Sequence, residues 1–151
     1  MMRPRHYRLK PDHSIEPVEI RNEEDLLHWC EEVWSGNGEA RRVAYTVICP
    51  GVSVSTVFLG IDHSFSERGP PILFETMVFT DYGGDEQWRW STWSEAAAGH
   101  DLTVARHRQR IDELQQLREL PDDEIDTSDI PETTDWSKAE RGRFSKPPER
   151  K

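Results

Sequence analysis

The stretch Val52-Ser-Val-Ser-Thr-Val-Phe-Leu-Gly-Ile61 decides the fold. It is rich in β-branched residues, which fit a pleated and half-buried surface, so it predicts a strand over 52–61. Pro50-Gly51, immediately before it, has the composition of a tight turn. On the other side of that turn, Arg42–Ile48 predicts a second strand. The two strands must be antiparallel, because a parallel pair needs a crossover of a dozen or more residues.

The same pattern continues downstream. The segment 62–71 is a loop that ends in Gly69-Pro70-Pro71, and Ile72–Thr80 predicts a third strand. Gly83-Gly84 marks the next turn, and the alternation over Glu86–Trp90 predicts a fourth strand. Connections this short favour an antiparallel meander.

One helix is expected before the meander in the sequence, and a second helix is expected after it. Asn22 is a suitable N-cap, acidic residues fill the turn after it, and Gly36-Asn37-Gly38 ends the apolar periodicity, which predicts a helix over 23–35. Thr92-Trp93-Ser94-Glu95 has the capping-box pattern and predicts the start of a second helix. That helix carries an apolar stripe at helical spacing, formed by Ala97, His100, Val104, His107, Ile111 and Leu114.

Two short extended segments, His6–Leu9 and Ile15–Ile20, precede the first helix and are separated by Pro11-Asp12-His13. The whole pattern predicts an α+β fold, in which a small antiparallel β-sheet meander is covered on one face by two helices.

Composition excludes several classes of protein. The chain has 151 residues, the usual size of one domain, and its 19 basic and 29 acidic residues give a formal net charge of −10. A negative body repels phosphate, so direct nucleic-acid binding is not expected. No apolar run approaches the roughly 20 residues that cross a bilayer. The basic start has no apolar stretch behind it, and two cysteines without a C-x-x-C motif suit a reducing compartment, so we expect a cytoplasmic protein.

The composition changes sharply near Leu120. Residues 119–135 contain eight acidic residues and no basic one, whereas 138–151 is mainly basic. Segments with so few apolar residues bury too little surface to offset the entropy of ordering. We therefore expect a single folded domain over 1–118 and a flexible tail over 119–151. Trp136 and Phe144 are apolar anchors with which such a tail could bind a partner; the alternative is a solvated extension.

Three ordered blocks, Val54–His63, Gly69–Phe79 and Trp90–His100, resemble an uncharacterised family of small bacteriophage and bacterial proteins. The resemblance implies a phage or prophage context and a bacterial host cell, and it supplies no activity, ligand or catalytic residue. The tail segment Asp126–Phe144 resembles the ends of small bacterial antitoxin-like proteins, which are flexible and wrap a partner. This chain lacks the DNA-binding module that such antitoxins carry.

One candidate site for chemistry combines Asp62, His63, Glu75 and His100. Asp62 and His63 lie at the end of the strand predicted over 52–61. Glu75 lies among apolar residues of the strand predicted over Ile72–Thr80, and His100 belongs to the apolar stripe of the second predicted helix. Two carboxylates and two histidines that converge would suit a divalent metal or acid–base catalysis. The alternative places Glu75 on a solvated face and His100 in a hydrogen-bonded core. No fixed metal-ligand spacing is present, so no resident metal or cofactor is expected.

A second candidate is the aromatic strand Trp88-Arg89-Trp90. The period of a strand places both tryptophans on one face and Arg89 on the other. Tryptophan and arginine dominate interface hot spots, so exposed tryptophans would form a partner-binding patch. The alternative is that both pack beneath a helix.

The sequence thus favours a non-enzymatic protein-interaction module of phage or prophage type, acting on a host or defence factor. Its expected partner-binding residues are Trp88, Arg89, Trp90, Trp136 and Phe144. The alternative is a small metal-dependent or acid–base enzyme, or a small-ligand-binding protein, at the group around Asp62. A third possibility is a homo-oligomer formed through edge strands or through the helix stripe.

Overall fold

The computed structural model describes residues 4–35, 38–65, 68–81, 83, 86–121, 124, 128, 135 and 137. The chain divides into two compact units, Met1–Leu114 and Gln115–Lys151. The elements, in chain order, are β1 (His6–Leu9), β2 (Ile15–Val18), α1 (Glu23–Trp34), the 3-10 turn η1 (Glu39–Arg41), β3 (Arg42–Cys49), β4 (Val52–Phe58), β5 (Phe74–Thr80), β6 (Gln87–Trp90) and α2 (Trp93–Glu119).

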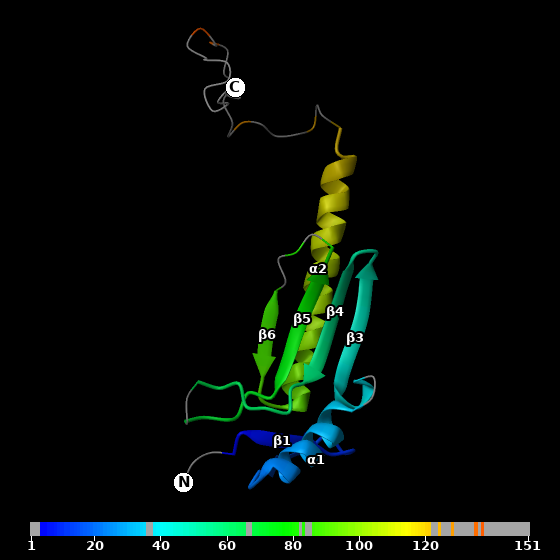
Figure 1. Cartoon of the computed structure of the whole chain (residues 1–151). Helices are drawn as coiled ribbons and strands as arrows, with labels where there is room; N and C mark the ends of the chain where they lie inside the picture. Colours follow the sequence, from blue (N-terminus) through cyan, green and yellow to red (C-terminus); the bar gives the residue numbers. More distant parts are fainter. Residues whose placement is uncertain are drawn as a thin grey trace, which may run out of the picture. The chain divides into compact units, whose positions relative to one another are not determined.

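The four strands β3 to β6 form one antiparallel sheet in the order β3-β4-β5-β6 (Figure 1). This confirms the predicted α+β class and the meander. The two early extended segments pair with each other as a separate antiparallel hairpin, β1-β2.

Strand alternation divides the side chains of the sheet between two faces. We call the face that packs against α2 the helix face; it carries Thr46, Val54, Thr56, Phe58, Phe74, Thr76, Val78, Trp88 and Trp90. We call the opposite face the open face; it carries Tyr45, Val47, Ser53, Ser55, Val57, Glu75, Met77, Phe79, Gln87 and Arg89. In Figure 1, α2 runs behind the strands.

The helix starts follow the local signals of the sequence. The Asn22 side chain accepts a hydrogen bond of 2.8 Å from the backbone N–H of Asp25, which caps α1. At α2, Thr92 Oγ1 accepts from the backbone N–H of Glu95 at 3.2 Å, and the Glu95 carboxylate accepts from that of Thr92 at 3.0 Å. The capping box is therefore formed as predicted.

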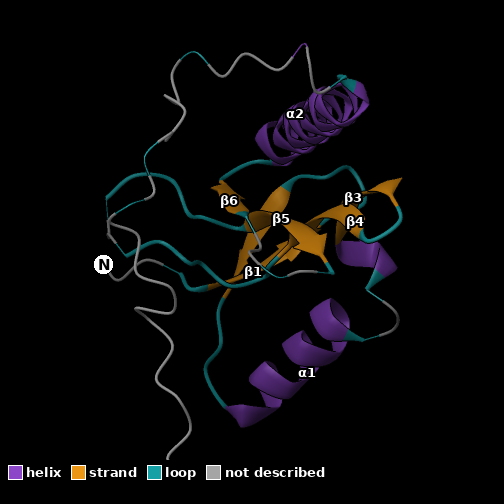
Figure 2. Ribbon diagram, turned by 90° about the horizontal axis from the view of Figure 1, so that it is seen from above, coloured by secondary structure: helices purple, strands orange, loops and turns teal. Residues whose placement is uncertain are grey.

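The two helices pack on the sheet in different places. Figure 2 shows α1 and α2 on opposite sides of the strands, whereas the sequence pattern predicts that both helices cover one face. Trp29 and Val33 of α1 join the hairpin and the ends of β4 and β5 in one apolar cluster, and the Trp29 indole N–H donates to the carbonyl of Tyr7 at 2.9 Å. A second cluster, beneath α2, contains Val54, Val78 and Val104.

The predicted stripe of α2 is only partly buried. The buried residues of the helix are Ala96, Gly99, His100, Thr103 and Val104, whereas Leu114 is 58% exposed. The part of α2 within the first unit, 93–114, rises about 33 Å, whereas a seven-residue strand spans about 23 Å. The strands therefore end before the helix does, and the stripe loses its partner towards Leu114. Within the described part of the chain, no helix is long and apolar enough to cross a membrane.

Candidate functional site

The structure places Asp62 and His63 at the start of the loop between β4 and β5. Asp62 is 8% exposed, and its Oδ1 accepts hydrogen bonds from the backbone N–H groups of Ser64 at 2.8 Å and Ile72 at 2.9 Å. The backbone N–H of His63 donates to the carbonyl of Ile72 at 2.9 Å. The Asp62 carboxylate therefore closes the base of this loop.

Glu75 lies on the open face, within β5. Its carboxylate pairs with Arg89 Nε at 3.1 Å and accepts a hydrogen bond from Gln87, both from the neighbouring strand β6. The Glu75 carboxylate can lie among apolar side chains of β5 because Arg89 and Gln87 of the neighbouring strand pair with its charge and donate hydrogen bonds to it.

His100 lies on the other side of the sheet, buried beneath α2 and 2% exposed. Its Nδ1 and Nε2 lie 2.9 Å from Thr56 Oγ1 and Thr46 Oγ1, respectively. Thr56 and Thr76 hydroxyls are also 2.9 Å apart, and the Trp90 indole N–H donates to Thr76 at the same distance. These side chains form one continuous hydrogen-bonded chain across the helix face.

The donor chemistry gives this chain a direction. The Trp90 indole can only donate, so the Thr76 hydroxyl accepts from it and can donate onward to Thr56. The Thr56 hydroxyl then donates to His100 Nδ1, which leaves the imidazole proton on Nε2 to donate to Thr46. In this assignment each hydroxyl or ring proton between Trp90 and Thr46 has an acceptor. Burial lowers the pKa of His100, which favours the same neutral ring.

The four residues of the predicted catalytic group are therefore not brought together. Glu75 and Thr76 are neighbours in β5, so their side chains point to opposite faces, and His100 lies on the side of Thr76. Among the residues that the structure describes, no group of three or more His, Cys, Asp or Glu side chains could hold a metal ion. The geometry supports the alternative of a hydrogen-bonded core histidine.

The aromatic strand is divided between the faces as its period predicts. The Trp90 ring lies over Gly99 of α2, and Trp88 lies beneath Arg106, whose guanidinium carbon is 5.6 Å from the ring centroid. Both rings are half-buried and pack against core clusters, whereas Arg89 lies on the open face. This placement supports the alternative interpretation, in which the two tryptophans pack beneath a helix.

The two remaining predicted partner-binding residues, Trp136 and Phe144, lie outside the described residues. So does most of the predicted tail 119–151.

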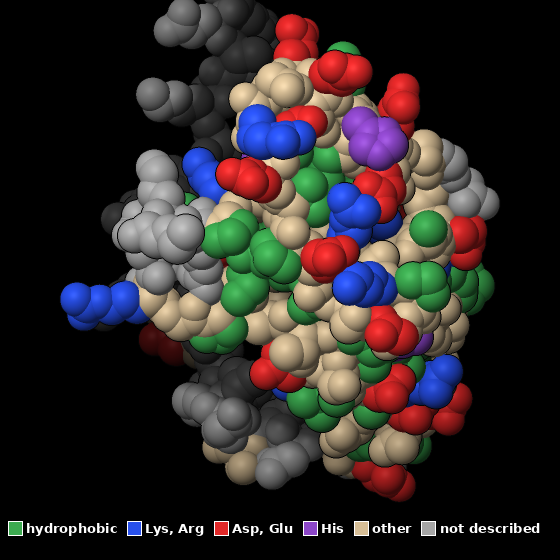
Figure 3. Space-filling view, turned by 90° about the horizontal axis from the view of Figure 1, so that it is seen from below, with side chains coloured by type: hydrophobic (Ala, Val, Ile, Leu, Met, Phe, Trp, Pro, Cys, Tyr) green, Lys and Arg blue, Asp and Glu red, His purple; other side chains and the backbone are tan. Residues whose placement is uncertain are grey.

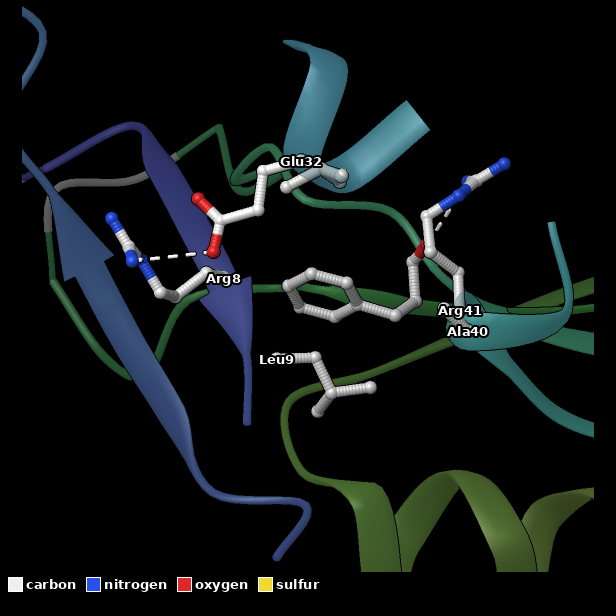
Figure 4. A pocket seen from close by; sticks show the side chains of 7 residues that line it. Arg8, Leu9, Glu32, Ala40 and Arg41 are labelled. Carbon is white, nitrogen blue, oxygen red and sulfur yellow. Dashed lines mark hydrogen bonds and ion pairs between the residues drawn. The ribbon is translucent and has the colours of Figure 1, made fainter. Parts of the chain in front are cut away.

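A small pocket of about 50 Å³ beside α1 is no better candidate for chemistry. Figure 4 shows the guanidinium groups of Arg8 and Arg41 pointing away from each other. Arg8 pairs with Glu32 at 3.2 Å, and Arg41 donates to the carbonyl of Phe58 at 3.3 Å. Neither cation is directed at a shared anion position.

The open face carries exposed apolar side chains near the β3 side of the sheet. Tyr45 is 52% exposed, Val47 59% and Phe79 44%. Val47 and Phe79 lie on either side of Ser53 in one cross-strand row, and a shallow hollow of about 210 Å³ lies between them and Asp81. By contrast, acidic and basic side chains are interspersed over the end of the first unit where α1 and the hairpin lie (Figure 3).

Sequence reasoning did not single out Tyr45, Val47 and Phe79. Their strand period was visible, but apolar residues occupy both faces of β3 to β5, so the pattern alone could not tell which face α2 covers. The chain matches no family model, no curated protein and no solved structure. Its candidate site is therefore defined by geometry.

Proposed function

We propose that the protein is a non-catalytic protein-interaction module and that its open face binds the partner. The observation that carries the proposal is the exposure of Tyr45, Val47 and Phe79 together on the face opposite α2. Contiguous apolar surface rimmed by polar groups is typical of a binding surface. Glu75 and Arg89, paired with each other, supply such a rim on the same face.

The proposed partner is a host or defence factor in a bacterial cell. The likeness of three sequence blocks to small phage and bacterial proteins supports this setting. The dispersed positions of Asp62, Glu75 and His100 favour binding over catalysis. The tail, with Trp136 and Phe144, would extend the contact to the same partner.

The test compares Phe79→Glu with the matched control Leu102→Glu in the full-length chain. Leu102 is 59% exposed on α2 and lies away from the open face, so both variants add one negative charge at an exposed apolar position. Tagged proteins are used to capture partners from a bacterial lysate, and the identified partner is then titrated. An aromatic hot-spot residue contributes about 2 kcal/mol, so Phe79→Glu should weaken binding about 30-fold and the control should retain affinity.

Equal capture by the wild type and by Phe79→Glu would overturn the role of the open face. A W136A/F144A double variant tests the tail separately. Unchanged affinity in that variant would remove the tail from the interface while leaving the open face as the binding surface.

A further inference from the structure

The outer strand β3 directs part of its backbone away from the sheet. At the two ends of the β4-β5 pair, the N–H of Leu59 donates to Leu73 O at 2.7 Å, and the N–H of Asp81 donates to Gly51 O at 3.1 Å. Odd-numbered positions of β4 therefore bond towards β5. Because backbone groups in an antiparallel strand alternate between its two neighbours, the even-numbered positions of β4 bond towards β3.

The register then fixes which groups of β3 are used. Val54 and Thr56 lie opposite Thr46 and Ala44, so Thr46 and Ala44 bond to β4. Tyr45, between them, and Val47 direct their N–H and C=O groups to the outer edge of the sheet. Figure 1 shows β3 as an outer strand of the sheet.

The two edges of the sheet differ in how they are protected against pairing. Edge strands are normally kept short, or carry charges or proline, so that they do not pair with another chain. β6 has four residues and includes Arg89. β3 has eight residues, and its stretch Val43–Cys49 contains no charged residue, proline or glycine. β3 has irregularities of register between Arg42 and Ala44 and between Val47 and Cys49, so the regular part of this edge that is open to pairing is 44–47.

We propose that β3 pairs antiparallel with β3 of a second copy of this chain, with Thr46 opposite Thr46. In this register Tyr45 of each copy lies opposite Val47 of the other, and their outward backbone groups bond to each other. An aromatic residue opposite a β-branched one, and threonine opposite threonine, are favourable cross-strand pairs.

The competing register, with Tyr45 opposite Tyr45, is less suitable. It needs Val43 opposite Val47, and Val43 lies at the irregularity between Arg42 and Ala44, where β3 loses its regular register with β4. The register centred on Thr46 bonds through Tyr45 and Val47, within the regular stretch of β3.

The charge of the protein does not oppose this contact locally. The regular stretch 44–47 contains no charged residue, so no like charges face each other where the two strands pair. Pairing joins two four-stranded sheets into one and places the two open faces side by side. The inference rests on the backbone of β3 and does not depend on which partner binds the open face.

The experiment measures the mass of the full-length chain by sedimentation equilibrium from micromolar to about millimolar concentration. The monomer is 17.6 kDa, and the wild type is expected to reach twice this mass. Val47→Pro removes one outward N–H per copy and leaves the bonds to β4 in place, so the dissociation constant should rise about 30-fold. Val47→Thr keeps that N–H and the β-branched shape, and should behave as the wild type. Far-UV circular dichroism establishes that each variant is folded.

Charge exchange tests the register and keeps the proposal testable if Val47→Pro does not fold. Tyr45→Lys alone and Val47→Glu alone should be monomers, whereas the double variant should dimerise again, because each lysine then faces a glutamate of the other copy. A monomeric wild type at every concentration overturns the proposal, as does a dimer that persists in both single charge variants. Failure of the double variant overturns the register. Phe79 lies two strands from β3, so Phe79→Glu should leave the dimer intact even if it abolishes partner binding.

Discussion

Replacing Gly99 with alanine sets helix propensity against packing. Alanine is favoured over glycine inside a helix by about 1 kcal/mol. However, a Cβ at Gly99 would lie 2.2 Å from Cζ2 and 2.5 Å from Cε2 of Trp90, well inside van der Waals contact. The ring cannot move away freely, because its N–H donates to the buried hydroxyl of Thr76 at 2.9 Å.

The packing cost should exceed the gain in propensity. Overpacking a core typically costs about 1–3 kcal/mol, and losing the hydrogen bond between Trp90 and Thr76 costs about 1 kcal/mol more. After subtraction of the propensity term, we expect Gly99→Ala to lower the free energy of unfolding by about 2 kcal/mol. In a domain of this size, that lowers the Tm by about 8 °C.

The assay is urea and thermal unfolding followed by circular dichroism. Ala98→Gly, at the exposed neighbouring position, calibrates the propensity term and should cost about 1 kcal/mol. Trp90→Phe removes the overlapping part of the ring, so Gly99→Ala should cost much less in that background. If Gly99→Ala raised the stability by about 1 kcal/mol, propensity alone would govern the site, and the packing of Trp90 on Gly99 would be refuted.

Three further predictions concern stability. Burial lowers the pKa of His100, so the unfolded chain binds a proton at this residue more readily than the folded chain does. The contribution of the neutral ring to the free energy of unfolding should therefore be complete above pH 6.5 and fall as the pH drops below that value. Urea midpoints compared from about pH 8 to about pH 5 should show a shallower fall in His100→Asn. Asn22→Ala removes the cap of α1 and should cost about 1 kcal/mol in chemical unfolding, whereas Asn22→Ser should retain most of it; equal losses would argue against the cap. Gly60→Ala should lower the Tm more than Gly69→Ala. Both glycines have a positive φ, but a Cβ at Gly60 would lie 2.8 Å from Val33, whereas a Cβ at Gly69 would meet no atom within 4 Å. Equal shifts in Tm would contradict the contact between residue 60 and Val33.

The elements of the fold follow from signals that act over a few residues. Asn22 and the Thr92–Glu95 box start their helices through hydrogen bonds within one turn. The β-branched stretch from Val52 forms a strand, and short connections make its neighbours antiparallel. Such signals can be read from the sequence because cause and effect lie close together along the chain.

The candidate site depended on contacts between distant residues. Glu75 and His100 could converge or lie apart, and the answer depended on which face of β5 packs against α2. The same packing leaves Tyr45, Val47 and Phe79 exposed. A strand period specifies that two faces exist, but burial of one of them is decided by the helix that packs there. The sequence by itself therefore determined the α+β elements, and only the tertiary structure decided which side chains are available to a partner.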